Sequence, residues 1–162
     1  MLHYSAPGKL VISGEWAILE VGNFGLVAAV NNRVHVFVEP ESEGISITAE
    51  EFKVKDARAK FADGRLVFES LDDKSKETLK LLSMALETAV KFAGEKGHAF
   101  KPFKISTSSK DTQFEVNGEL KKVGFGSSAA IVVAAISAVL DFHGCKASKE
   151  EIYKLATIAH YF

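Results

Sequence analysis

Cysteine is almost absent from this sequence. Cys145 is the only one among 162 residues, so the chain can form neither an intrachain disulfide nor a zinc site built on a cysteine cluster. The five histidines are scattered, and none stands at metal-ligand spacing from another histidine, the cysteine or a carboxylate. The sequence therefore predicts a chain from a reducing compartment, with no metal cage made of side chains alone.

An excess of charge and a long hydrophobic run are also missing. Lys and Arg number 20 against 21 Asp and Glu, and a net charge of -1 gives a nucleic-acid partner no overall electrostatic support. The longest apolar run, residues 129–140, is too short to span a bilayer. No apolar segment follows a basic start after Met1, as a secretory signal requires. We therefore expect a cytoplasmic protein with neither a nucleic-acid nor a membrane partner.

The hydrophobic pattern predicts a mixture of strands and helices. A chain of 162 residues suffices for one domain with a core. The first seventy or so residues read mainly as strands, including short ones at 2–5 and 10–13 that a turn at residues 6–9 would separate. Three- and four-residue spacings over 76–92 predict an amphipathic helix. The expected fold class is α+β.

Later segments continue this mixture. Residues 102–107 read as a strand, and Asn117-Gly118 suggests a hairpin. An uncharged run over 131–140 predicts a buried helix, with Gly144 just past its end. Ser148 and Glu151 form a capping box that would open a last helix over residues 149–160.

The segment with the clearest chemistry is residues 121–130, which read KKVGFGSSAA. Its glycines allow backbone N–H groups to approach a ligand closely. A helix that begins after them presents unpaired N–H donors and a partial positive charge. No Asp or Glu occupies the expected first turn, and Lys121 and Lys122 lie just upstream, so the pattern predicts that a phosphate binds there. A serine at such a helix start can also bind a phosphate-held Mg²⁺.

Other interpretations of this segment remain open. It can be a tight turn before a core helix, with the serines as N-caps. It also matches the loose Gly-x-Gly-x-x-Ala dinucleotide fingerprint, although no strand runs straight into Gly124 and no acidic residue lies about twenty positions on. By position alone, Lys9 reads as a solvated turn lysine and Trp16 as a core residue.

Two motifs together resemble a known family. Residues 7–20, PGKLVISGEWAILE, are similar to the first signature of the galactokinase–homoserine kinase–mevalonate kinase–phosphomevalonate kinase (GHMP) superfamily. Residues 124–130, GFGSSAA, resemble its Gly-Leu-Gly-Ser-Ser-Ala-Ala phosphate loop. Within the superfamily the sequence most resembles the phosphomevalonate kinases. Trp16 stands where mevalonate kinases usually carry a histidine, and Lys121-Lys122 directly precede the loop.

The resemblance implies a fold and a role for each matching position. The fold would be a two-layer, ribosomal-protein-like α+β domain with a mixed sheet and a left-handed β-α-β unit. Lys9 and Lys122 would be catalytic, the first contacting the transferring phosphoryl group and the second neutralising its developing charge. Ser128 would bind Mg²⁺. The residues that would hold the phosphates of ATP are Gly124, Phe125, Gly126, Ser127, Ser128 and Ala129. These roles suit phosphoryl transfer, which depends on positioning and electrostatic stabilisation.

The resemblance also implies that part of the enzyme is missing. Such kinases continue into a Gly-Ser-Gly-x-Asp-like segment with the catalytic aspartate, and then into a second domain. The sequence stops at Phe162, before both. We therefore expect residues 1–162 to form a truncated N-terminal ATP-binding domain, inactive alone, whose C-terminal domain is further chain or a separate partner. The implied reaction converts ATP and 5-phosphomevalonate to ADP and 5-diphosphomevalonate.

The resemblance leaves several activities open. Mevalonate kinase, another small-metabolite kinase of the superfamily and diphosphomevalonate decarboxylase are alternatives, because substrate choice depends partly on the missing half. A non-catalytic nucleotide-binding or interaction domain is an alternative of a different class. A dinucleotide-binding oxidoreductase is a more distant one.

Overall fold

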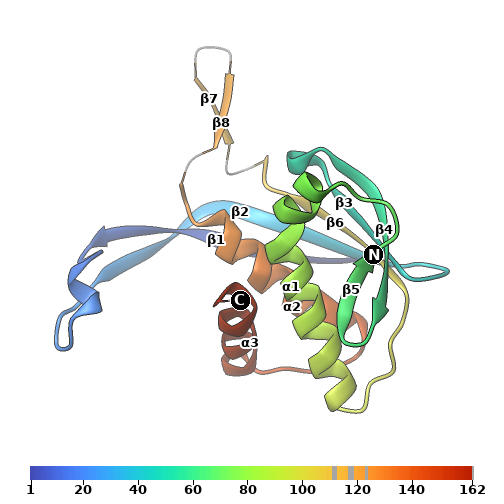
Figure 1. Ribbon diagram of the computed structural model, residues 1–162. Helices are drawn as coiled ribbons and strands as arrows, with labels where there is room; N and C mark the ends of the chain where they lie inside the picture. The colour runs from blue at the N-terminus through green and yellow to red at the C-terminus, as the bar shows by residue number, and fades with distance from the viewer. Residues whose placement is uncertain (111–112, 117–118, 123, 162) are drawn as a thin grey trace.

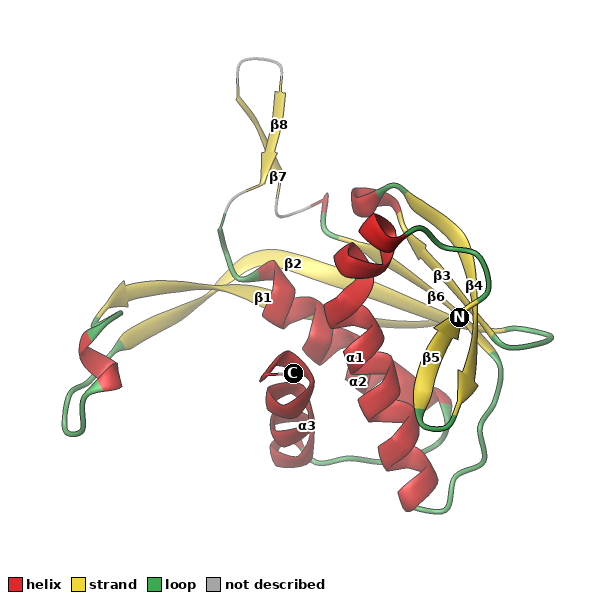
Figure 2. Ribbon diagram, in the orientation of Figure 1, coloured by secondary structure: helices red, strands yellow, loops and turns green. Residues whose placement is uncertain are grey.

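The computed structural model contains one mixed sheet with three helices packed on one of its faces (Figures 1 and 2). It describes the backbone of residues 1–110, 113–116, 119–122 and 124–161. The sheet has the strand order β1-β2-β6-β3-β4-β5. Its strands are β1 (Leu2–Ser13), β2 (Leu26–Pro40), β3 (Ile45–Ala49), β4 (Val54–Ala62), β5 (Arg65–Phe68) and β6 (Phe103–Ser108). The α+β fold class predicted from the sequence is confirmed.

The strand directions show how the sheet is assembled. β3 and β6 run parallel to each other, whereas β1–β2, β2–β6, β3–β4 and β4–β5 are antiparallel pairs. The chain passes from β3 to β6 through β4, β5 and α1 (Asp73–Glu95). The left-handed sense that the resemblance implies for such a unit stays a prediction. A separate hairpin of β7 (Gln113–Val116) and β8 (Glu119–Lys122) confirms the predicted pairing around residues 117–118, which lie outside the described part.

The core lies between the sheet and the helices α1, α2 (Ser127–Phe142) and α3 (Lys149–Tyr161). On β2, Val34, Val36 and Val38 are buried, while the residues between them are only half-buried and lie on the opposite face. Many of the buried residues of α2 are alanines, whose small side chains let this helix pack closely against its neighbours. Among the described residues, no helix combines the length and apolar character that a membrane crossing requires.

Most helix ends follow the predicted signals. The predicted helix over 76–92 is longer in the structure and runs from Asp73 to Glu95. It begins earlier because Asp72 accepts a hydrogen bond from the Ser75 N–H at 2.9 Å and so caps the helix start. The capping box of α3 is present, with the Ser148 N–H donating to Glu151 at 2.9 Å and the Glu151 N–H donating to the Ser148 hydroxyl at 3.2 Å. Gly144 follows α2 with φ +77°, as its predicted capping role requires.

The first hairpin differs from the prediction. β1 is one continuous strand, and the predicted turn at residues 6–9 is instead a register shift between Pro7 and Lys9. Pro7 and Gly8 are local turn signals, but long-range pairing with β2 overrides them. The apolar run at 26–30 and the strand predicted from Arg33 likewise join into the single strand β2.

The distal half of this hairpin, residues 10–27, projects beyond the helices, and we call it the arm (Figure 2). The 3₁₀ helix η1 (Ala17–Leu19) lies at its tip. Trp16, expected in the core, is 78% exposed, because it lies in the arm beyond the region that the helices cover. The arm's exposed large apolar side chains are Leu10, Ile12, Trp16, Ile18, Leu19, Val21, Phe24, Leu26 and Val27.

His143, directly after α2, is a buried polar group with a defined tautomer. Its side chain is 3% exposed and lies against the rings of Phe100, Phe103 and Phe142. Its Nδ1–H donates to the Val139 carbonyl at 2.8 Å, and its Nε2 accepts the Lys101 N–H at 3.2 Å. Burial lowers the pKa of His143 below its ordinary value, despite the favourable bond to Val139.

This lowered pKa predicts an acid-dependent loss of stability. The unfolded chain binds a proton at His143 more readily than the folded chain does. The contribution of neutral, buried His143 to the free energy of unfolding is therefore fully present above about pH 6.5, the ordinary histidine pKa. It is lost as pH falls from there through the folded pKa. Urea unfolding at several pH values should show a shallower decline for His143→Gln than for the unchanged chain. The matched variant His160→Gln, at an exposed position, should keep the full decline, and equal slopes for both variants would contradict the assignment.

Candidate phosphate-binding site

The segment 124–129 forms a loop and the first turn of α2, as predicted. Gly126 is the N-cap residue, with φ +69° and ψ +35°, a left-handed conformation that favours glycine. The serines therefore lie in the first helical turn, which corrects the interpretation of them as N-caps. Within the described part, this helix end has neither a side-chain cap nor an acidic residue in its first turn. The N–H donors and positive dipole end of α2 are thus available to an anion.

Lys9 of β1 lies against this helix end. Its backbone N–H donates to the Phe125 carbonyl oxygen at 2.7 Å. Its side chain passes over Gly126, since a Cβ placed on Gly126 would lie 3.1 Å from the Lys9 Cγ and 3.3 Å from its Cε. Lys9 is exposed, so its ammonium needs no buried counter-charge. The structure thus brings Lys9, of the motif at residues 7–20, into contact with the loop at residues 124–130.

For the other predicted site residues, the structure gives the exposure of Ser127, Ser128 and Ala129 and the backbone position of Lys122. Ser128 and Ala129 are exposed, and Ser127 is half-buried. Lys122 is the last residue of β8 and lies just before the loop along the chain, but its side chain is outside the described part. The proximity of Lys122 to a bound phosphate therefore stays a prediction.

A small cavity lies beside the first turn of α2, and one of its residues was missed by sequence reasoning. The cavity, of about 60 Å³, is lined by Ser127 and Ser128 together with Glu51 of the 3₁₀ helix η2 (Glu50–Phe52). Glu51 Oε1 accepts the Thr107 hydroxyl at 2.9 Å, and Oε2 is buried with no hydrogen-bond partner within the described residues. In the sequence, Glu51 is one of two adjacent glutamates, Glu50 and Glu51. Nothing in that pattern indicates that one of them is buried beside the start of α2.

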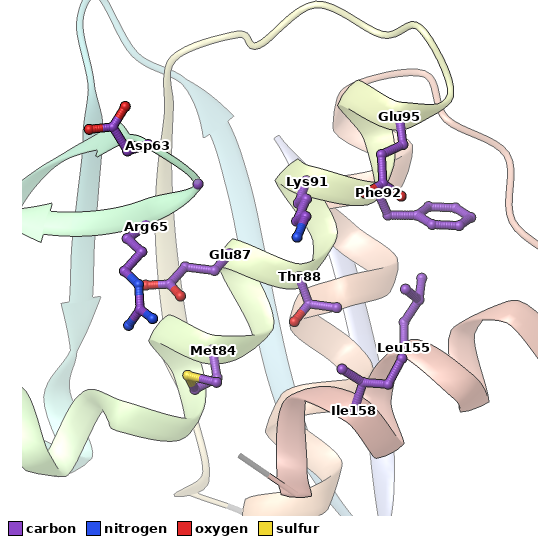
Figure 3. Close-up of a pocket in the computed structure, with 11 residues that line it drawn as sticks. Asp63, Arg65, Met84, Glu87, Thr88, Lys91, Phe92, Glu95, Leu155 and Ile158 are labelled. Atoms are coloured by element: carbon purple, nitrogen blue, oxygen red, sulfur yellow. The ribbon is translucent and has the colours of Figure 1, made fainter.

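A second and larger cavity lies away from the predicted residues (Figure 3). Its volume is about 440 Å³, and it is lined by residues of α1, α3 and the β4–β5 turn. Met84, Leu155 and Ile158 form an apolar wall, and Glu87 is fixed by accepting the Leu66 N–H at 2.9 Å. Neither Lys9 nor any residue of 124–129 lines it. We therefore assign no part of the phosphate chemistry to this cavity.

Sequence comparison relates this chain to known kinases. A sequence model described as "GHMP kinases N terminal domain" matches residues 80–161. Phosphomevalonate kinase from Streptomyces sp. (strain CL190) is 30% identical over 160 residues, which cover 95% of this chain and 41% of that protein. Mevalonate kinase from Thermococcus onnurineus (strain NA1) is 34% identical over 152 residues, covering 93% of this chain and 42% of that protein.

A solved structure supports the fold. Phosphomevalonate kinase from Streptococcus pneumoniae, in complex with phosphomevalonate and AMPPNP, superposes with a TM-score of 0.74 at 23% identity. The match covers 98% of this chain and 42% of that chain. The chain thus spans about two fifths of the length of these relatives. The family model covers more than half of the sequence, so the chain belongs to the GHMP kinases and carries their N-terminal domain.

Proposed function

We propose that this chain is the ATP-binding domain of a kinase that transfers the γ-phosphoryl group of ATP to 5-phosphomevalonate. One observation carries the proposal: the Lys9 side chain lies over Gly126, at a helix end where the described residues supply neither a side-chain cap nor an acidic group. A lysine side chain and several backbone N–H donors therefore meet at one helix end, an arrangement that suits the terminal phosphates of a nucleotide. The relatives named phosphomevalonate kinase and mevalonate kinase support the substrate class.

Each predicted residue then has a defined task. Backbone N–H groups of residues 124–129 bind phosphate oxygens, and Lys9 and Lys122 offset the charge that develops on the transferring phosphoryl group. No part of this arrangement needs the protein to form a covalent bond with the phosphoryl group. The domain positions the nucleotide and stabilises charge.

Magnesium suits this site as a partner of the nucleotide. The described residues contain no group of three or more His, Cys, Asp or Glu side chains that would hold a metal alone. The exposed Ser128 hydroxyl is a hard oxygen ligand at the same helix end, and Mg²⁺ in such sites takes most of its remaining ligands from phosphates and water. When bound, the ion would offset negative charge on the phosphates.

Further polypeptide would complete the site. The relatives extend well beyond the matched region, and the arm exposes apolar side chains such as Trp16, Leu19 and Phe24. A concentration of exposed apolar side chains in one segment often marks an interface. We expect a downstream domain, as further chain or as a separate polypeptide, to cover the arm and to supply the general base.

The proposal is tested by measuring ADP release from Mg-ATP, with the chain alone and with the downstream polypeptide. Phosphomevalonate and mevalonate are compared as acceptors. Turnover of phosphomevalonate only with both pieces is the expected result. A clear preference for mevalonate would support mevalonate kinase, which the Thermococcus relative favours. Nucleotide binding without turnover of any acceptor would indicate a non-catalytic domain.

Ser128→Ala should weaken Mg-ATP binding more than it weakens folding. Because the N-cap residue of α2 is Gly126 rather than a serine, the change should cost less than the roughly 1 kcal/mol of a lost serine cap. Calorimetric titration with Mg-ATP and urea unfolding measure the two effects. Ser137→Ala is the matched control, because Ser137 lies on the same helix and its hydroxyl donates to the Val133 carbonyl of that helix at 2.8 Å. Equal losses of binding and stability for Ser128→Ala would show a purely structural role.

A further inference from the structure

The register shift in β1 lies directly beside the phosphate loop. Pro7 pairs with Arg33 and Lys9 pairs with Ala29, so Gly8 stands opposite three residues of β2, numbers 30–32. Such irregularities redirect a strand and often lie next to functional sites. Here the strand meets the loop, because the residue after Gly8 donates its N–H to the Phe125 carbonyl oxygen.

Gly8 has no room for a side chain. A Cβ at this position would lie 2.7 Å from the Phe125 carbonyl oxygen, 2.9 Å from the Phe125 Cβ and 3.1 Å from the Val30 Cγ2. The first two atoms belong to the loop's backbone and to the root of a side chain, so they cannot move aside as the end of a flexible side chain can. Gly8 is not among the glycines with positive φ. Close approach, rather than a special backbone conformation, therefore requires glycine here.

We propose that Gly8 is a positioning residue of the phosphate site. Its missing side chain lets β1 contact the loop, and the Lys9–Phe125 hydrogen bond then fixes Gly126 and the first N–H groups of α2 relative to the Lys9 ammonium. Phe125 directly precedes the N-cap residue, so a displaced Phe125 carbonyl displaces the donors that follow it. The inference rests on the proposed nucleotide site, but the coupling between β1 and the loop is a property of the chain itself.

Gly8→Ala in the full-length protein tests this coupling. We expect the Kd for Mg-ATP to rise tenfold or more, with a much smaller change in the KM for the phosphoryl acceptor. Amide hydrogen exchange of residues 124–130, measured without nucleotide, should also become faster than in the unchanged protein. This second measurement does not depend on kinase activity.

Two control variants separate positioning from general destabilisation. Gly94→Ala adds the same methyl group within α1, where nothing lies within 4 Å of the new Cβ, and should leave both measurements unchanged. Ile45→Val creates a small cavity on β3, in a fully buried position, and lowers stability without touching the loop. ATP affinity within twofold of the unchanged protein, with unaltered exchange at 124–130, would overturn the inference. If the unchanged protein binds no ATP, the proposed function fails and the exchange measurement alone decides the coupling.

Discussion

Lys9→Met is expected to lower kcat/KM for phosphoryl transfer by about 10²–10³-fold, by analogy with the loss of one oxyanion-hole donor. Methionine keeps an unbranched apolar stem over Gly126 but removes the ammonium. Since Lys9 is exposed, the loss should affect charge stabilisation rather than folding. Steady-state kinetics of the full-length enzyme with Mg-ATP and phosphomevalonate measure the effect, and urea unfolding monitors stability.

Two further lysine variants define what this result means. Lys9→Arg keeps the charge on a planar, bulkier group, so partial activity would indicate that position matters as well as charge. Lys146→Met removes an exposed lysine beyond the opposite end of α2 and should leave the kinetics unchanged. If Lys9→Met retains more than a tenth of the original kcat/KM, Lys9 does not have the assigned role.

Phe103→Ala should be strongly destabilising, with a cost of about 3–5 kcal/mol in the free energy of unfolding. Phe103 is 0% exposed on β6, the strand that joins the two halves of the sheet. Its ring packs against Phe100, Phe142 and His143. Removing it leaves a cavity where the sheet meets the end of α2. The midpoint of urea unfolding measures the loss.

The arm supplies the matched control for this substitution. Phe24 is 91% exposed, so Phe24→Ala deletes the same side chain where little buried contact is lost. Surface substitutions of this kind usually change stability by about 0.5 kcal/mol or less. A similar shift of the urea midpoint for both variants would contradict the described core.

Local signals in the sequence predicted the helices well. The leucines at 79, 82 and 86 lie on the buried face of α1, and the Ser148–Glu151 capping box opens α3. Both features depend on residues three or four positions apart, which a helix places side by side. Gly144 was predictable for a different local reason, since a helix end often needs a residue that tolerates positive φ.

Long-range contacts account for what the sequence could not show. Residues 6–9 look like a turn by composition, and only pairing with β2 makes them part of a strand. Trp16 illustrates that apolar residues need not be buried when the element that carries them projects from the core. The predicted helix start after Gly126 is present in the structure. Its contact with Lys9 and the nearby carboxylate of Glu51 depend on segments far apart in the chain.

The place of β6 in the sheet sets an order for folding during synthesis. β6 lies between β2 and β3, yet it leaves the ribosome after both of them and after all of α1. Until then, β1–β2 and β3–β4–β5 are two separate antiparallel groups, each with an unpaired edge of backbone donors and acceptors. Such edges readily pair with other chains, and non-local pairing of this kind is slow. The nascent chain is therefore most vulnerable to aggregation in the interval before residues 103–108 become available to close the sheet.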